Sequence, residues 1–210
     1  QEQTSNGVRP GIRVVNVDGA TVFVQRQGKA LAEFIFSDTV NGYVATKISL
    51  LSSHLLKSPK DMSVRKATSA DEGDRLLIVN EDDGSIACYT LLRAQDVIAP
   101  TEWITDGEFL AVGVDIAETY VVTKRNINGS DVYYVELFDS SLTLDCAKSG
   151  TTATTVTGLS FLEAETVKVI RDGIVEADKT VSSGEITLDR EATSSYQVGL
   201  NYTPTVVTLP

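Results

Sequence analysis

The chain has 210 residues, of which 42% are hydrophobic and 22% are charged, a composition typical of a folded globular protein. Twenty-nine acidic against 18 basic residues give a formal net charge of -11, which argues against a nucleic-acid groove or an anionic membrane surface as partner. The two cysteines, Cys88 and Cys146, are too few for a disulfide-stapled scaffold, and no apolar run reaches the roughly 18 residues of a membrane helix.

The chain begins at Gln1 rather than Met, so we expect a processed product or a part of a longer protein. Residues 1–11 are polar, end in Pro10-Gly11 and predict an unstructured start. A first group of short strands follows, with a two-residue hairpin signal at Asp18-Gly19 and a second turn around Gly28. The strands expected in this group are Ile12–Val17, Thr21–Arg26, Leu31–Phe36 and Tyr43–Lys47.

One helix is expected between the first and second groups of strands. Ser49–Lys57 carries apolar residues at positions 50, 51, 55 and 56. That spacing predicts one or two helical turns, which Ser58-Pro59 would end.

Two further groups of strands repeat the opening pattern. In the second group, Pro100 requires its strand to lie at a sheet edge, because proline cannot donate to a ladder. In the third group, Asn128-Gly129 predicts a tight turn. The expected strands are Met62–Thr68, Arg75–Asn80, Ser85–Leu92 and Val97–Trp103, and then Phe109–Asp115, Thr119–Arg125 and Val132–Phe138.

The three groups align by their turn glycines, Gly28, Gly84 and Gly129. A repeat of about 40–50 residues with four short antiparallel strands per unit is typical of a β-propeller blade. Three copies are fewer than the 4–8 blades of a closed ring. We therefore predict an all-β fold in which residues 1–157 form about three blade-like sheets, either part of a larger propeller or an open arc.

The remaining residues, 158–210, predict a small β-barrel or sandwich domain. The Ser/Thr/Gly-rich passage Leu142–Thr157 before it is interpreted as a linker with one edge strand. Asp172-Gly173 and Ser183-Gly184 predict two hairpins. The expected strands are Thr166–Ile170, Ile174–Val175, Lys179–Ser182, Glu185–Asp189, Tyr196–Leu200 and Thr205–Leu209.

Five segments, in this order, carry a resemblance to a known family. They are VFVQRQGKALAEF (22–34), GYVATKISLLSSHLL (42–56), DDGSIACYTLLRAQDVIAPTEW (82–103), KRNINGSDVYYVELFD (124–139) and the stretch 162–210 that begins LEAETVKVIRDGIVEADKTV. Together they resemble the tail nozzle, or tail tubular, proteins of short-tailed phages. The resemblance covers most of the chain from about Val22, and no single segment in it is chemically diagnostic.

The resemblance implies a non-enzymatic structural protein of the virion tail, made in the bacterial cytoplasm. It implies a ring of identical subunits, commonly six, around the channel through which DNA leaves, with neighbouring tail and adaptor proteins as further partners. It also implies that the chain is part of a longer protein. We expect neither specific nucleic-acid binding nor membrane insertion. The acidic total would suit a channel wall that does not hold phosphate, or would simply keep the protein soluble.

No catalytic, cofactor-binding or metal-ligating residue is predicted. Glu81–Gly84 places carboxylates beside a glycine turn, but without the spacing of a calcium loop, so a solvated hairpin is favoured. Cys88 and His54 are a conceivable thiol–imidazole pair, against which the strand-like alternation around Cys88 favours a buried strand residue. Asn128-Gly129-Ser130 fits a glycosylation acceptor, although its turn role explains it.

The aromatic residues leave an alternative function open. Packing within or between blades is the ordinary role of such residues, whereas an exposed row would indicate stacking on a glycan. The residues in question are Tyr89, Trp103, Tyr120, Tyr133 and Tyr134. The alternative to a nozzle subunit is thus a tail-associated module that binds a surface glycan or protein. A hydrolase is the weakest hypothesis, because the sequence shows no recognisable catalytic carboxylate pair and lacks a GxSxG motif.

Overall fold

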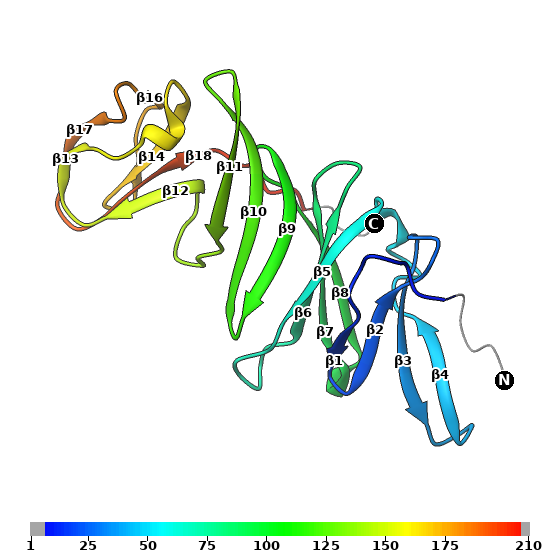
Figure 1. The fold of residues 1–210 in the computed structure, drawn as a ribbon. Coiled ribbons are helices and arrows are strands. Elements are labelled where there is room, and N and C mark those ends of the chain that lie inside the picture. Colours follow the sequence, from blue (N-terminus) through cyan, green and yellow to red (C-terminus); the bar gives the residue numbers. More distant parts are fainter. Residues whose placement is uncertain (1–6, 207–210) are drawn as a thin grey trace. The chain divides into compact units, whose positions relative to one another are not determined.

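The computed structural model describes residues 7–206, and the prediction of an all-β fold is confirmed (Figure 1). The contacts divide the chain into two compact units. The first unit holds the described residues up to Thr123 together with Tyr134–Phe138, and the second holds Lys124–Tyr133 and the described residues from Asp139 onward. Each unit is described by itself below. No helix in residues 7–206 is long and apolar enough to cross a bilayer.

The first sheet contains four strands in chain order. They are β1 (Val15–Val17), β2 (Ala20–Val24), β3 (Leu31–Ser37) and β4 (Gly42–Lys47). Asp18 and Gly19 have φ values of 47° and 80°, so both occupy the left-handed region that a two-residue hairpin turn requires. The expected unstructured start is wrong for Gly7–Arg9, because Val8 bridges Gln25 and the Arg9 amide donates to the Val24 carbonyl at 2.9 Å. Residues 1–6 lie outside the described part.

The middle sheet repeats this order with four longer strands. They are β5 (Pro59–Arg65), β6 (Asp74–Asn80), β7 (Ile86–Leu92) and β8 (Val97–Trp103). A short 3-10 helix, η2 (Arg93–Gln95), joins the last two. β8 lies at the edge, as Pro100 predicts from the sequence. In this strand Pro100 pairs with Tyr89.

The third sheet has three strands in the order β11-β10-β9. They are β9 (Glu108–Asp115), β10 (Glu118–Ile127) and β11 (Ser130–Leu137). Asn128 and Gly129 form the turn with φ values of 49° and 75°. The tip of this hairpin, Lys124–Tyr133, belongs to the second unit, and the rest of the sheet belongs to the first.

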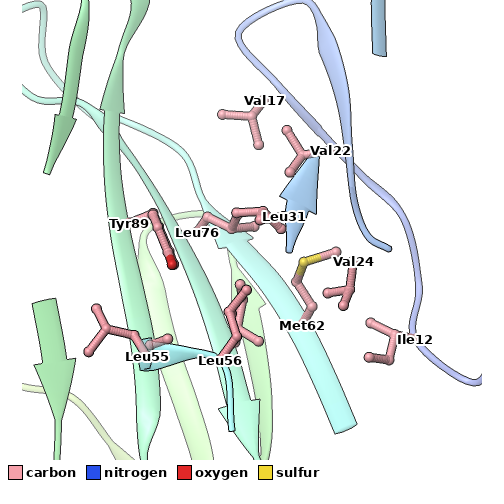
Figure 2. Close-up of a cluster of buried hydrophobic side chains, with 12 residues drawn as sticks. Ile12, Val17, Val22, Val24, Leu31, Leu55, Leu56, Met62, Leu76 and Tyr89 are labelled. Carbon is pink, nitrogen blue, oxygen red and sulfur yellow. The ribbon is translucent and has the colours of Figure 1, made fainter. Parts of the chain in front are cut away.

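The central strands of the middle sheet bury both faces, as the alternation along β6 shows, whereas the edge strand β8 is exposed from Val97 to Glu102. Leu76 and Ile78 join the cluster that includes Val22, Val24 and Leu31 of the first sheet (Figure 2). Leu77 and Val79 point the other way and join a second cluster with Phe109, Val112 and Val121 of the third sheet. The uninterrupted apolar run of β6 follows from this stacking, because a strand covered on both faces has no solvent side.

The predicted helix at Ser49–Lys57 is wrong in extent, since only η1 (Ser53–Leu55) forms, as one 3-10 turn. Two serine hydroxyls of this segment form hydrogen bonds with residues outside it. The Ser49 hydroxyl accepts the Leu31 backbone amide at 2.8 Å, and the Ser52 hydroxyl donates to the Tyr89 hydroxyl at 3.1 Å. Leu55 and Leu56 enter the core beside the first sheet. Tertiary contacts therefore override the helical spacing.

The second unit is built from short strands. They are β12 (Asp145–Gly150), β13 (Ala153–Val156), β14 (Thr166–Arg171), β15 (Ile174–Val175), β16 (Lys179–Thr180), β17 (Ile186–Ala192) and β18 (Tyr196–Leu200). One sheet has the order β12-β18-β14-β15 with β16 beside β14, and β13 pairs with β17. A 3-10 turn, η3 (Ser160–Leu162), precedes β14. Fully buried aliphatic side chains fill this unit: Leu159, Leu162, Val167, Val169, Val181 and Val198.

The passage Leu142–Thr157, predicted as a linker with one edge strand, forms two strands instead. This passage supplies β12, which pairs with β18, and β13, which pairs with β17. The expected boundary after residue 157 thus differs from the contact clustering, which places residues from Asp139 onward in the second unit.

The two C-terminal hairpins form to different degrees. The Asp172-Gly173 turn joins β14 and β15 as predicted. At Ser183-Gly184, only Ser182 and Glu185 bridge, and the strands then part, β16 to β14 and β17 to β13. The strand predicted at Thr205–Leu209 is not formed at Thr205 and Val206, and its remaining residues lie outside the described part.

Candidate functional site

The acidic turn Glu81–Gly84 holds an ammonium group rather than an open ligand set. Asp83 accepts hydrogen bonds from the Ser85 amide and hydroxyl, and from the Lys57 ammonium at 2.6 Å. Partial burial tends to raise the pKa of Asp83, but these bonds outweigh it and lower the pKa. The bond to Asp83 is also the largest cause of the raised pKa of Lys57. No group of three or more potential metal ligands occurs within residues 7–206.

Cys88 and His54 lie in different surroundings. Cys88 is buried in the cluster between the middle and third sheets, where burial raises the pKa of its thiol. A raised pKa disfavours the thiolate that nucleophilic chemistry needs. His54 is exposed on η1, beside Leu55, which packs on the opposite face of the middle sheet. The structure therefore does not bring the two residues together as a pair.

Asn128-Gly129-Ser130 is an exposed hairpin tip within the second unit. The backbone amide of Asn128 donates to the Glu165 carboxylate at 3.0 Å. The left-handed φ of Asn128 and Gly129 accounts for both residue types, because asparagine and glycine tolerate that region best. The sequence pattern is thus explained by the turn.

The aromatic residues singled out in the sequence do not form one row. Tyr89 is buried in the core, and Trp103 packs on Phe138 with ring centroids 4.8 Å apart. Tyr120 and Tyr134 are half-buried, and only Tyr133 is mostly exposed.

An aromatic cluster that sequence reasoning missed lies on the first sheet, and it consists of Phe34, Phe36 and Tyr43. Phe34 stacks on Tyr43 at 5.0 Å, and Phe36 meets Tyr43 edge-on at 5.5 Å. Phe36 is 47% exposed and Tyr43 is 59% exposed. Leu31 packs toward the middle sheet. Because side chains alternate between the two faces along a strand, Phe34 and Phe36 point away from the middle sheet. Tyr43 pairs with Phe36 and shares its face. The signal available in the sequence was the i, i+2 pair of phenylalanines.

A shallow apolar depression of about 260 Å³ marks the third sheet. Besides Asp61 and Arg13 at its border, the residues that line it are Ala111, Val112, Gly113, Tyr120, Val121, Val122 and Val135. We call this feature the apolar depression.

The polar border of the apolar depression is already paired. The Asp61 carboxylate accepts the Val112 amide at 3.0 Å and the Arg13 guanidinium at 3.2 Å. With both groups engaged and an apolar lining, the depression suits an apolar side chain better than a reacting substrate.

Comparison with known proteins returned neither a matching family model nor a matching curated protein. The functional proposals below therefore rest on the residues and geometry of this chain and on the sequence resemblance described above.

Proposed function

We propose that this protein is a structural subunit that works by assembling with other copies of itself, as a part of a phage tail nozzle or connector. The observation that carries the proposal is the middle sheet, whose central strands are buried on both faces between two other antiparallel sheets. Such stacking makes a rigid wedge with few internal degrees of freedom. A wedge of this kind supplies shape and contact surface rather than chemistry.

The same observation supports a propeller architecture as a further part of the proposal. Consecutive four-stranded antiparallel sheets that cover one another face to face are the building principle of propeller blades. The turn glycines of the three sheets, Gly28, Gly84 and Gly129, all have positive φ, between 64° and 75°. In each sheet this turn joins the second and third strands. We propose accordingly that the sheets are successive blades, and that the second unit closes as a small barrel.

The proposed partners are other copies in a ring, commonly six in the family that the sequence resembles, and neighbouring tail and adaptor proteins. The proposed location is the virion tail. The net charge of -11 supports a wall that repels phosphate while DNA passes. Binding to the duplex would be a disadvantage in such a channel.

Negative-stain microscopy combined with mass measurement tests the proposal. We expect ring-shaped particles with a central opening, and passage through them without retention of duplex DNA at physiological salt. A monomer at micromolar concentration that binds cells or glycans would contradict the nozzle and support the alternative below.

The alternative function is a tail-associated binding module for a host glycan or protein. The exposed aromatic cluster of Phe34, Phe36 and Tyr43 favours it, because sugar rings stack on such faces. A glycan array distinguishes the two functions. Binding that is lost in Tyr43→Ala and kept in Leu51→Ala, whose side chain is exposed on a loop, would favour the module.

A further inference from the structure

The longest strand within residues 7–206, β10, passes from one unit into the other. Its residues 118–123 belong to the first unit, and its residues 124–127 belong to the second. The partner strand β11 crosses back in the same way, since residues 130–133 belong to the second unit and residues 134–137 to the first. The second unit thus contains the hairpin tip Lys124–Tyr133, whose two strands continue into the third sheet.

One face of β10 is buried along the whole strand. Thr119, Val121 and Thr123 are at most 4% exposed, and Val121 packs in the cluster between the middle and third sheets. Arg125 and Ile127 occupy the next two positions on the same face, and they are 1% and 7% exposed. The buried row therefore continues from the core of the first unit into the part of the strand that belongs to the second unit.

The hairpin tip is bound at two separate places of the second unit. The Arg125 guanidinium donates to both carboxylate oxygens of Asp145, the first residue of β12, at 3.0 and 2.9 Å. The backbone amide of Asn128 donates to the Glu165 carboxylate at 3.0 Å. Glu165 directly precedes β14, and its backbone carbonyl accepts the Val181 amide at 3.0 Å. The tip therefore links the start of β12 to the segment before β14.

The start of β12 is weakly held by its own sheet. β12 lies at the edge of the order β12-β18-β14-β15, so it has one strand partner, and its register with β18 is interrupted between Asp145 and Lys148. The Asp145 side chain is only 18% exposed, so its carboxylate is poorly hydrated and needs the guanidinium beside it. Arg125 thus supplies at this end of β12 what the interrupted ladder does not.

We infer that the hairpin tip completes the second unit, and that β10 and β11 thereby couple the unfolding of this unit to the opening of the third sheet. The second unit is accordingly a discontinuous domain, in which residues 139–210 close around a tip that the third sheet contributes. Local unfolding proceeds in cooperative units that often coincide with such supersecondary motifs. The inference goes beyond the proposed function, because it concerns contacts within this chain whatever the chain assembles with.

Hydrogen exchange of the whole chain, measured by mass spectrometry, tests whether the tip completes the second unit. Ile127→Ala empties a buried position of the tip, and we expect amide exchange in β14 and β18 to rise by more than about tenfold. Ile174→Ala is the matched control: it makes the same change in β15 of the second unit, where the side chain is 59% exposed, and exchange should change by less than about twofold. Glu165→Ala removes only the acceptor of the Asn128 amide and should raise exchange several-fold.

A second pair of variants tests the coupling from the side of the first unit. Val121→Ala loosens β10 where it packs on the middle sheet, and Val24→Ala makes the same change in the first sheet. Both side chains are buried, at 3% and 1% exposure. We expect Val121→Ala to raise exchange in β14 and β18 by more than about threefold and Val24→Ala to leave it unchanged, because only β10 continues into the second unit. The fluorescence of Trp103 establishes that the first unit is folded in both variants.

Each part of the inference has a result that overturns it. Exchange in β14 and β18 that is the same in Ile127→Ala as in the wild type, or as in Ile174→Ala, would show that the second unit is complete without the tip. If Ile127→Ala does not fold, Glu165→Ala decides the same question, and unchanged exchange in that variant overturns the inference. A rise in Val24→Ala as large as that in Val121→Ala would show that the coupling does not run through the hairpin.

Discussion

The middle sheet of the first unit and the second unit are stabilised by different kinds of interaction. The middle sheet relies on apolar side chains buried on both faces, with large residues such as Leu76, Leu77 and Tyr89 fully enclosed. Burying each such side chain contributes about 1.5–3 kcal/mol. The sheet therefore depends on its neighbours in the stack, because exposing either apolar face to water would lose this stabilisation.

The second unit relies more on carboxylates that bind backbone amides. Asp172, in the turn after β14, accepts the amides of the three successive residues 193–195 at 2.8–3.1 Å. Glu163 accepts the amides of Ser183 and Gly184 at 2.9 and 2.7 Å. Each carboxylate fixes a turn against a distant segment, which suits short strands around a small core of valines and leucines.

This contrast indicates that the stacked sheets and the small β-domain lose stability through different kinds of substitution. The stack should be most sensitive to lost volume between layers, and the second unit to lost charge pairs. Four experiments, with five substitutions in all besides their controls, test this division in order of expected effect.

The largest effect is expected for Arg125→Ala in the second unit. Arg125 is 1% exposed, and its guanidinium binds both Asp145 oxygens, at 3.0 and 2.9 Å. Removing the guanidinium takes the bidentate cation from the Asp145 carboxylate, whose side chain is only 18% exposed, so we expect a loss of about 3–5 kcal/mol in the free energy of unfolding. Denaturant titration measures it. The exposed pair Lys168–Asp178 provides the control: Lys168→Ala should cost under about 1 kcal/mol.

Leu76→Ala and Leu77→Ala come next and test whether both faces of β6 matter. Each side chain is fully buried, one toward each neighbouring sheet. We expect each variant to lose about 2–5 kcal/mol through lost contacts and a residual cavity. The fluorescence of Trp103, the single tryptophan and a member of the first unit, follows the transition. A loss confined to one of the two variants would contradict the stacking on both faces.

Asn80→Ala tests the side-chain hydrogen bonds that hold the segment before β5. In the buried side-chain amide of Asn80, Nδ2 donates to the Leu55 carbonyl at 2.9 Å and Oδ1 accepts the Lys57 backbone amide at 2.9 Å. Leaving these groups unpaired should cost about 1–3 kcal/mol. Hydrogen exchange should rise first at Leu55–Lys57. Asn16→Ala, at an exposed position of β1, is the matched control and should change stability by less than about 0.5 kcal/mol.

Asp172→Asn gives the smallest effect and carries a pH signature. Three backbone amides, from Ser195, Ser194 and Thr193, lower the pKa of Asp172. The ionised carboxylate therefore stabilises the fold fully above the usual pKa of about 4 and loses this contribution as pH falls toward the lower folded-state pKa. Asparagine tolerates the left-handed turn, so only the charge and one acceptor are lost.

We expect the melting temperature of Asp172→Asn to lie several degrees below that of the wild type at pH 7. The difference should shrink as the pH falls below about 4, because the wild type then loses the same charge. A difference that stays constant down to pH 2 would show that the carboxylate charge plays no part.

The sequence by itself determined most strands and their tight turns, because both signals are local. Alternation with period two defines a strand, and Asp18-Gly19, Asn128-Gly129 and Asp172-Gly173 supply the left-handed backbone that hairpins need. It also predicted the edge position of Pro100, which follows from the missing amide proton alone.

Tertiary structure alone decided where distant segments pair. The passage around β12 and β13 looks like a linker because its strand partners, β18 and β17, come some 30–50 residues later, and a local pattern carries no trace of them. Ser49–Lys57 has helical spacing, yet Leu31 and Tyr89 take its serine hydroxyls and the core takes its leucines. The exposed aromatic cluster of the first sheet belongs to the same class, since burial on one face and exposure on the other depend on which sheets stack. An aromatic residue in a strand reads the same in sequence whether it is enclosed like Tyr89 or exposed like Tyr43.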